Sequence, residues 1–88
     1  MSTLGALTAA WTAVEAALPL GWQMVGVVRR EQALRLLPVV SDLPRPDWCA
    51  LAADEAGILY DGWGEFHYQA LTNLAIKLRE LRGSASGH

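Results

Sequence analysis

Two stretches with apolar side chains at helical spacing, one near each end of the chain, constrain the fold most. In the N-terminal stretch the apolar residues recur three or four positions apart, at Leu4, Leu7, Trp11, Val14 and Leu18. The C-terminal stretch repeats this spacing at Leu71, Leu74, Leu78 and Leu81. Such spacing places each set on one helix face, and that face must be buried. The chain is therefore predicted to begin and end in helices that share a core.

The middle of the chain has the β-branched and aromatic side chains of strands. Strands are predicted over residues 22–30, 48–53 and 58–61. Gly57, which can adopt a positive φ, favours a turn over residues 54–57. These segments predict a small antiparallel sheet.

Residues 31–40 are ambiguous. Their composition favours a helix, whereas the alternation of Leu34 and Leu36 around Arg35 suits a strand. We predict a strand here. It would lie at the edge of the sheet, because Pro38 has no amide hydrogen to donate.

The remaining segments mark boundaries. Residues 41–47, with two prolines and two aspartates, are predicted to form a loop. Residues 62–64 are expected to interrupt regular structure before a helix over residues 65–82, which Gly83 would cap. Residues 84–88 have no large apolar side chain to bury and are predicted to be disordered.

Together these elements predict an α+β fold in the order α-β-β-β-α, as a single domain over residues 1–83. An antiparallel sheet of three or four strands would have the N- and C-terminal helices packed on one face. The opposite face would carry some of Trp22, Met24, Trp48 and Tyr60. A partner or a second copy would cover it.

Composition restricts the classes of function. The 88 residues are 52% apolar, which suits one small globular domain. Seven basic and nine acidic residues argue against a protein that tracks a phosphate backbone. No apolar run reaches the roughly 18 residues needed to cross a membrane, so no membrane partner is expected. Cys49 is the one cysteine, so a cytoplasmic location without an internal disulfide is expected.

Two groups of polar residues could suggest a catalytic or metal site. Cys49 and His67 could pair as thiolate and imidazole. The best metal-ligand set is Asp61, Glu65, His67 and Cys49. We favour structural roles, because Cys49 lies in an apolar strand and His67 at the margin of a helix stripe. Glu65 and His67, two positions apart, point in different directions. The prediction is a protein that is not an enzyme and holds no metal or cofactor.

Gly62 and Gly64 before a helix could form a phosphate-binding turn. However, a third glycine and a lysine are missing and Glu65 would repel an anion, so a tight strand-to-helix connection is favoured.

Basic residues could converge beside a tryptophan to hold single-stranded nucleic acid. They are Arg29, Arg30, Arg35, Arg45, Lys77, Arg79 and Arg82. Because the net charge is negative, we favour a rim of solvated cations over a nucleic-acid-binding patch.

The segment from Ile58 to Gly62 and the following Tyr68-Gln69-Ala70-Leu71 resemble the HicB-type antitoxin domain, a relative of the double-stranded-RNA-binding fold. In that family a final strand ends in glycine and leads into a helix opened by an acidic-Ala-Leu motif. The resemblance covers the last third of the chain and implies an α-β-β-β-α fold. Glu65 and Gln69 stand where RNA binders of this fold have lysines, so the resemblance does not imply RNA binding.

The predicted function is a small non-catalytic protein–protein interaction module, such as a bacterial or phage accessory protein, inhibitor or antitoxin-like factor. Four tryptophans and a high apolar content in so short a chain favour it. The expected partner is another protein or a second copy in a homodimer. The alternative is a nucleic-acid-binding domain that uses arginines and exposed aromatic residues. The residues assigned to partner binding are Trp22, Met24, Trp48, Tyr60, Trp63, Arg29 and Arg30.

Overall fold

The computed structural model describes residues 3–37 and 46–86 of the chain. Its elements are α1 (Thr3–Ala17), β1 (Gln23–Arg29), α2 (Arg30–Leu36), β2 (Trp48–Ala53), β3 (Leu59–Gly64) and α3 (His67–Ser86). The three strands form one antiparallel sheet in the order β1-β2-β3. This confirms the predicted α+β fold with a helix near each end, and it adds α2 between the first two strands.

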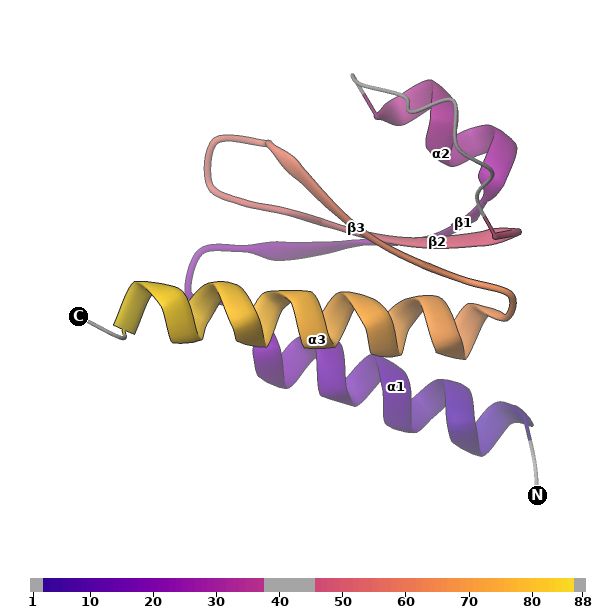
Figure 1. Cartoon of the computed structure of the whole chain (residues 1–88), viewed down its shortest axis with the longest axis horizontal. Helices are drawn as coiled ribbons and strands as arrows, with labels where there is room; N and C mark the ends of the chain where they lie inside the picture. The colour runs from indigo at the N-terminus through magenta and orange to yellow at the C-terminus, as the bar shows by residue number, and fades with distance from the viewer. Residues whose placement is uncertain (1–2, 38–45, 87–88) are drawn as a thin grey trace.

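The helices lie on both sides of the sheet (Figure 1). α3 packs directly on β2 and β3, and α1 lies along α3, farther from the strands. α2 lies on the opposite side of the sheet. The prediction that both terminal helices pack on one sheet face is therefore only partly right, because α1 contacts mainly α3. No helix in the described ranges is long and apolar enough to cross a membrane.

The central strand, β2, is buried from Cys49 to Ala53. Its successive side chains point to opposite faces of the sheet. Ala50 and Ala52 belong to the main core, which α1 and α3 complete chiefly with Val14, Leu71, Leu74 and Leu78. Cys49 and Leu51 point the other way and pack with Ala33 of α2. The sheet therefore separates a large core from a smaller one.

Gly62 and Gly64 bring α3 against β3. A Cβ atom on Gly62 would lie 2.7 Å from the carbonyl oxygen of Ala70, and one on Gly64 would lie 2.6 Å from the Ala70 amide nitrogen. Glycine allows the strand and helix backbones to approach this closely. Both residues belong to β3. The predicted interruption over residues 62–64 is therefore wrong.

The strand predicted over residues 31–40 is also wrong, because residues 30–36 form α2 and leave a three-stranded sheet in the described part of the chain. Glu31 and Arg35 lie in the first and last turns, where their charges complement the helix dipole. Ala33 is fully buried and anchors the helix to the sheet. The helix ends before Leu37, whose extended backbone (φ −82°, ψ 131°) is the conformation that a following proline favours.

The C-terminal helix ends later than predicted. α3 continues through Gly83 to Ser86, so the predicted helix cap at Gly83 is wrong. Residues 87–88 of the predicted tail lie outside the described residues, as do residues 38–45 of the predicted strand and loop.

The hairpin between β2 and β3 confirms the predicted turn. Asp54 Oδ1 accepts hydrogen bonds from the amides of Ala56 and Ile58, each at 2.9 Å. Gly57 has a φ of +84°, which L side chains rarely adopt. The Tyr60 hydroxyl donates to Asp54 Oδ2 at 3.2 Å. One aspartate therefore organises the turn and ties it to the returning strand.

Candidate functional site

One end of the sheet carries a row of three cross-strand neighbours. Arg29 at the end of β1 pairs with Trp48 at the start of β2, and Trp48 pairs with Gly64 at the end of β3. Directly opposite residues share a sheet face, so the Arg29 and Trp48 side chains are neighbours. α3 begins three residues after Gly64. The start of the helix therefore lies beside this row.

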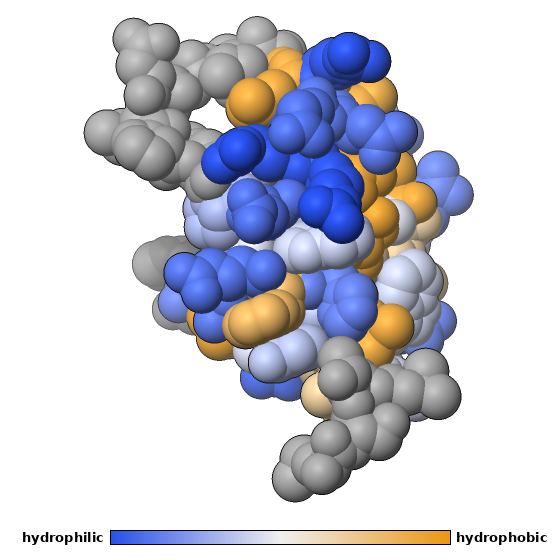
Figure 2. All heavy atoms as spheres, turned by 90° about the vertical axis from the view of Figure 1, so that its right-hand side faces the viewer, coloured by the Kyte–Doolittle hydropathy of each residue, from blue (hydrophilic) through white to orange (hydrophobic). Residues whose placement is uncertain are grey.

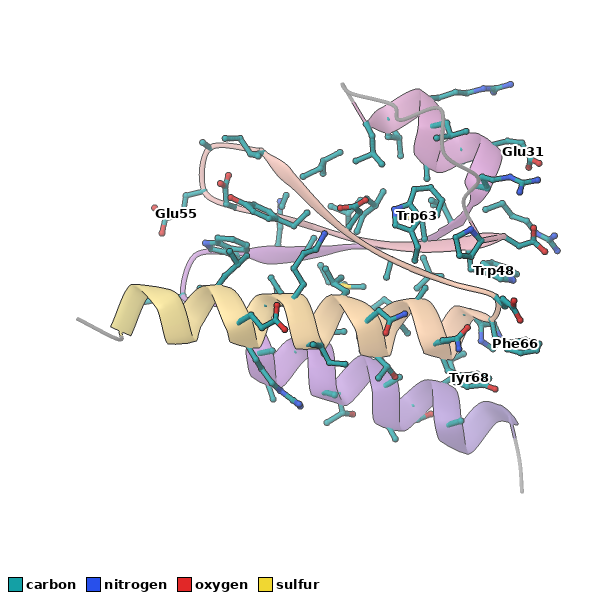
Figure 3. All side chains as sticks on the ribbon, viewed as in Figure 1. Glu31, Trp48, Glu55, Trp63, Phe66 and Tyr68 are labelled. Atoms are coloured by element: carbon teal, nitrogen blue, oxygen red, sulfur yellow. The ribbon has the colours of Figure 1, made fainter. Side chains whose placement is uncertain are left out.

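Side chains from the row and from the start of α3 form a continuous cluster, which we call the aromatic end: Arg29, Trp48, Phe66, His67 and Tyr68. Arg29 Cζ lies 4.7 Å from the centroid of the Trp48 ring. The ring centroids of Trp48 and His67 are 5.6 Å apart, and those of His67 and Tyr68 are 6.0 Å apart. The Phe66 and Tyr68 rings are parallel, with centroids 5.6 Å apart. Figure 3 shows Trp48, Phe66 and Tyr68 at the same end of the molecule.

Hydrogen bonds brace the loop that presents Phe66. The side-chain oxygen of Gln69 accepts from the Glu65 amide at 2.7 Å. His67 Nδ1 accepts from the Tyr68 amide at 2.8 Å. Amides at a helix start have no partner within the helix, so these side chains satisfy groups that would otherwise need water. Phe66 is 53% exposed on this braced loop.

Charges of both signs surround the aromatic end. Arg30 Nη1 lies 3.7 Å from Asp47 Oδ1, with the two side chains 42% and 66% exposed. So exposed a pair contributes at most about 1 kcal/mol. Glu31 and Glu65 add exposed acidic groups. Figure 2, which faces this end, shows strongly hydrophilic side chains in the middle of its upper part, apolar ones at the top and right, and below them an apolar side chain between hydrophilic and weakly hydrophilic neighbours. The surface is therefore aromatic with mixed charge.

The face of the sheet on the α2 side carries a polar network at the β3 edge. Asp61 Oδ1 accepts a hydrogen bond from Lys77 Nζ at 2.9 Å, and Asp61 Oδ2 accepts one from Trp63 Nε1. Burial by itself would raise the pKa of Asp61. The hydrogen bonds from Lys77 and Trp63 outweigh burial and lower that pKa below its ordinary value of 3.8. Trp63 also packs on the small core, so this predicted binding residue has a structural role.

Four of the predicted binding residues lie on the sheet face that the terminal helices cover. Trp22, Met24, Trp48 and Tyr60 are all partly buried and pack against the main core. The prediction that they mark an uncovered face is therefore wrong. Trp22 and Tyr60 contact each other, with ring centroids 4.5 Å apart. Desolvation raises the pKa of Tyr60, and the Asp54 carboxylate raises it further.

The structure does not bring the candidate catalytic pair together. Cys49 is fully buried in the small core on the α2 side. His67 contacts Trp48, and successive residues of a strand point to opposite faces, so His67 and Cys49 lie on different sides of the sheet. Among the residues described, no three His, Cys, Asp or Glu side chains are grouped so as to hold a metal ion.

The two remaining candidates are the phosphate-binding turn at Gly62 and Gly64 and the cluster of basic residues. Gly62 and Gly64 serve the contact between strand and helix, and they form no anion-binding turn. Of the basic residues, Arg29 belongs to the aromatic end, and Arg30 follows it as the first residue of α2. Lys77, which bonds Asp61, is ten residues along α3 from His67, about 15 Å. Lys77 therefore lies apart from the arginines at the end of β1 and the start of α2.

Sequence reasoning missed Phe66 as a candidate binding residue. The available signal was its position, because it lies outside the apolar stripe of the C-terminal helix and stands between Glu65 and His67. An apolar ring between two polar residues just before a helix has no place in that stripe. Its stacking on Tyr68 could not be read from the sequence, because it depends on the path of the loop.

Comparisons with protein-family models, curated proteins and solved structures found no match to this chain. The resemblance to the HicB-type antitoxin domain stays a prediction.

Proposed function

We propose that the chain is a small protein-interaction domain and that the aromatic end binds its partner. The observation that carries this proposal is Phe66, which is 53% exposed and stacked on Tyr68 in a braced loop. Full burial of a phenylalanine side chain stabilises a fold by roughly 1.5–3 kcal/mol. This small domain forgoes much of that gain at Phe66, which favours a role for the ring outside the fold.

The chemistry of the aromatic end supports the same proposal. Aromatic residues and arginine are enriched in protein interfaces, and tryptophan, tyrosine and arginine are enriched among the residues that dominate binding energy. The rings here contact one another, and the Arg29 guanidinium rests on Trp48. Side chains already held in place lose little conformational entropy when a partner binds.

The experiment is affinity capture from cell extract with the wild-type chain, Phe66→Ala and Ile76→Ala, followed by measurement of affinity for each captured protein. Ile76 is a matched control, because it is 45% exposed and lies on α3, about 15 Å along the helix from Phe66. We expect Phe66→Ala to weaken binding at least about tenfold, the effect of losing a central contact, and Ile76→Ala to leave it unchanged. A partner bound equally by wild type and Phe66→Ala would contradict the proposal.

A second candidate function is the binding of single-stranded nucleic acid, and the contact between Arg29 and Trp48 favours it. A guanidinium on an aromatic face beside stacked rings can hold phosphates and bases together. The test is fluorescence anisotropy of a mixed-sequence oligonucleotide at low and high salt, with Arg29→Ala and, as control, Arg79→Ala. Binding that is lost at high salt and in Arg29→Ala alone would favour this function. No binding at low salt would eliminate it.

A further inference from the structure

Helix α3 begins at a residue that cannot cap it. The Phe66 carbonyl accepts a helical hydrogen bond from the Ala70 amide at 3.0 Å, so Phe66 holds the N-cap position. Serine, threonine, aspartate and asparagine are preferred there, because their side-chain oxygens accept from an amide of the first turn. Phenylalanine has no such acceptor. The amides at the start of α3 therefore depend on other side chains.

His67, the next residue, supplies an acceptor. Its Nδ1 accepts a hydrogen bond from the Tyr68 amide at 2.8 Å. An imidazole nitrogen accepts only while it carries no proton, so this bond requires neutral His67 with its hydrogen on Nε2. The same ring contacts Trp48 of β2, with centroids 5.6 Å apart. The neutral imidazole therefore connects the first turn of α3, directly after Phe66, to the sheet.

Protonation of the His67 ring would break this hydrogen bond. The imidazolium ion has a hydrogen on both nitrogens, so Nδ1 could no longer accept from the Tyr68 amide. The new positive charge would also lie at the start of a 20-residue helix, the end at which the helix dipole disfavours cations. Histidine side chains in general change charge between about pH 5 and 8. Mild acid is therefore expected to loosen the start of α3.

The charges nearest to the His67 ring have both signs. The two rings in contact with it, those of Trp48 and Tyr68, are uncharged. Arg29 rests on Trp48 and would repel an imidazolium, whereas Glu65, two residues before His67, would attract one. Both of these side chains are exposed, and exposed charges interact weakly in water. The lost hydrogen bond and the helix dipole therefore decide the effect of protonation.

Charges on the other elements packed nearby are paired or distant. The paired ones are Asp47 with Arg30 and Asp61 with Lys77. In α1 the titratable side chain is Glu15, near the end of that helix, whereas the start of α3 lies at the end of the molecule where α1 begins (Figure 1). Glu31 belongs to α2, on the opposite side of the sheet. These groups leave the argument for His67 unchanged.

We propose that His67 is a pH-sensitive cap of α3, which holds Phe66 in place while neutral and releases it when protonated. The consequence for binding rests on the proposed function of the aromatic end. A partner that uses Phe66 would bind at neutral pH and dissociate in mild acid, because the ring would then have to be ordered again on binding.

The first experiment is nuclear magnetic resonance of the free chain at about pH 7.5 and 5, with wild type, His67→Asn and His88→Asn. Asparagine has Oδ1 at the position of histidine Nδ1, so it keeps an acceptor that does not titrate. His88 is the other histidine of the chain and serves as the control. In wild type and His88→Asn we expect the Nε2–H form of His67 at neutral pH. Backbone order parameters of Phe66 and Tyr68 should fall in acid from about 0.85 toward 0.6, whereas His67→Asn should keep its order.

Three results would overturn the proposal. They are the Nδ1–H form of His67 at neutral pH, backbone order that acid leaves unchanged in the wild type, and an equal loss of order in His67→Asn. The first two concern the wild type alone, so they do not require that a variant folds. All three are measured without a partner and do not depend on the proposed function.

The second experiment measures, at the same two pH values, the affinity of each partner that Phe66→Ala weakens. We expect wild type to bind about fivefold more weakly in acid, the effect of losing a helix cap, and His67→Asn to bind equally at both pH values. A partner that requires Phe66 but binds wild type equally well in acid would overturn control by pH. A partner that binds Phe66→Ala as tightly as wild type would instead contradict the proposed function.

Discussion

At the scale of single residues, three of the four tryptophans have structural partners. Trp22 contacts Tyr60, Trp63 packs on the small core, and Trp48 contacts Arg29 and His67. Trp48 alone of the three belongs to the aromatic end. A tryptophan-rich composition therefore predicts little about which ring meets a partner. Phe66 is more than half exposed, as are Leu20, Leu36 and Ile58, and it differs from these three in that its ring stacks on another ring, that of Tyr68.

Asp61 carries a prediction about pH. Its pKa is lowered in the folded chain by the hydrogen bonds from Lys77 and Trp63, so ionised Asp61 stabilises the fold. That contribution is complete above the ordinary pKa of 3.8 and is lost as the pH falls through the lower folded pKa. We therefore expect Asp61→Asn to reduce the free energy of unfolding at neutral pH, with the difference from wild type shrinking in acid. Urea unfolding of both proteins at several pH values measures this. A difference that persists unchanged in acid would contradict the assignment.

At the scale of elements, the closest contact is between β3 and α3 at Gly62 and Gly64. We expect Gly62→Ala to destabilise the fold by about 1–3 kcal/mol or more, because the new methyl group would meet the backbone of α3. Gly5→Ala in α1 is the control: nothing lies within 4 Å, and alanine favours a helix by about 0.5–1 kcal/mol. Thermal and denaturant unfolding measure both. Equal stability of Gly62→Ala and wild type would contradict this close contact between β3 and α3.

The elements also show what the sequence could and could not predict. The terminal helices and β2 follow from periodic or apolar runs and are found where they were predicted, although α3 continues beyond the predicted end to Ser86. α2 was missed because its seven residues suit either a strand or a helix, and burial of Ala33 against the sheet decides between them. Gly62 and Gly64 were predicted to interrupt the strand. Their small size is required by contact with α3, which the local sequence does not reveal. The contacts of Phe66 likewise depend on where the sheet places the start of α3.

At the scale of the whole molecule, the sheet gives the domain two separate surfaces. The aromatic end lies where β1 ends and β2 and α3 begin, and the β1 edge runs along one side of the sheet. The first offers aromatic and cationic side chains, and the second offers backbone groups flanked by valines. The two surfaces therefore differ in the groups that they expose.

The most direct test of this account compares proteins captured by wild type, Phe66→Ala and Ile76→Ala under identical conditions, with quantitative mass spectrometry as the readout. The account predicts a set of partners that is depleted at least about tenfold with Phe66→Ala and retained with Ile76→Ala. A captured set that is unchanged by Phe66→Ala would show that the aromatic end is not the binding surface.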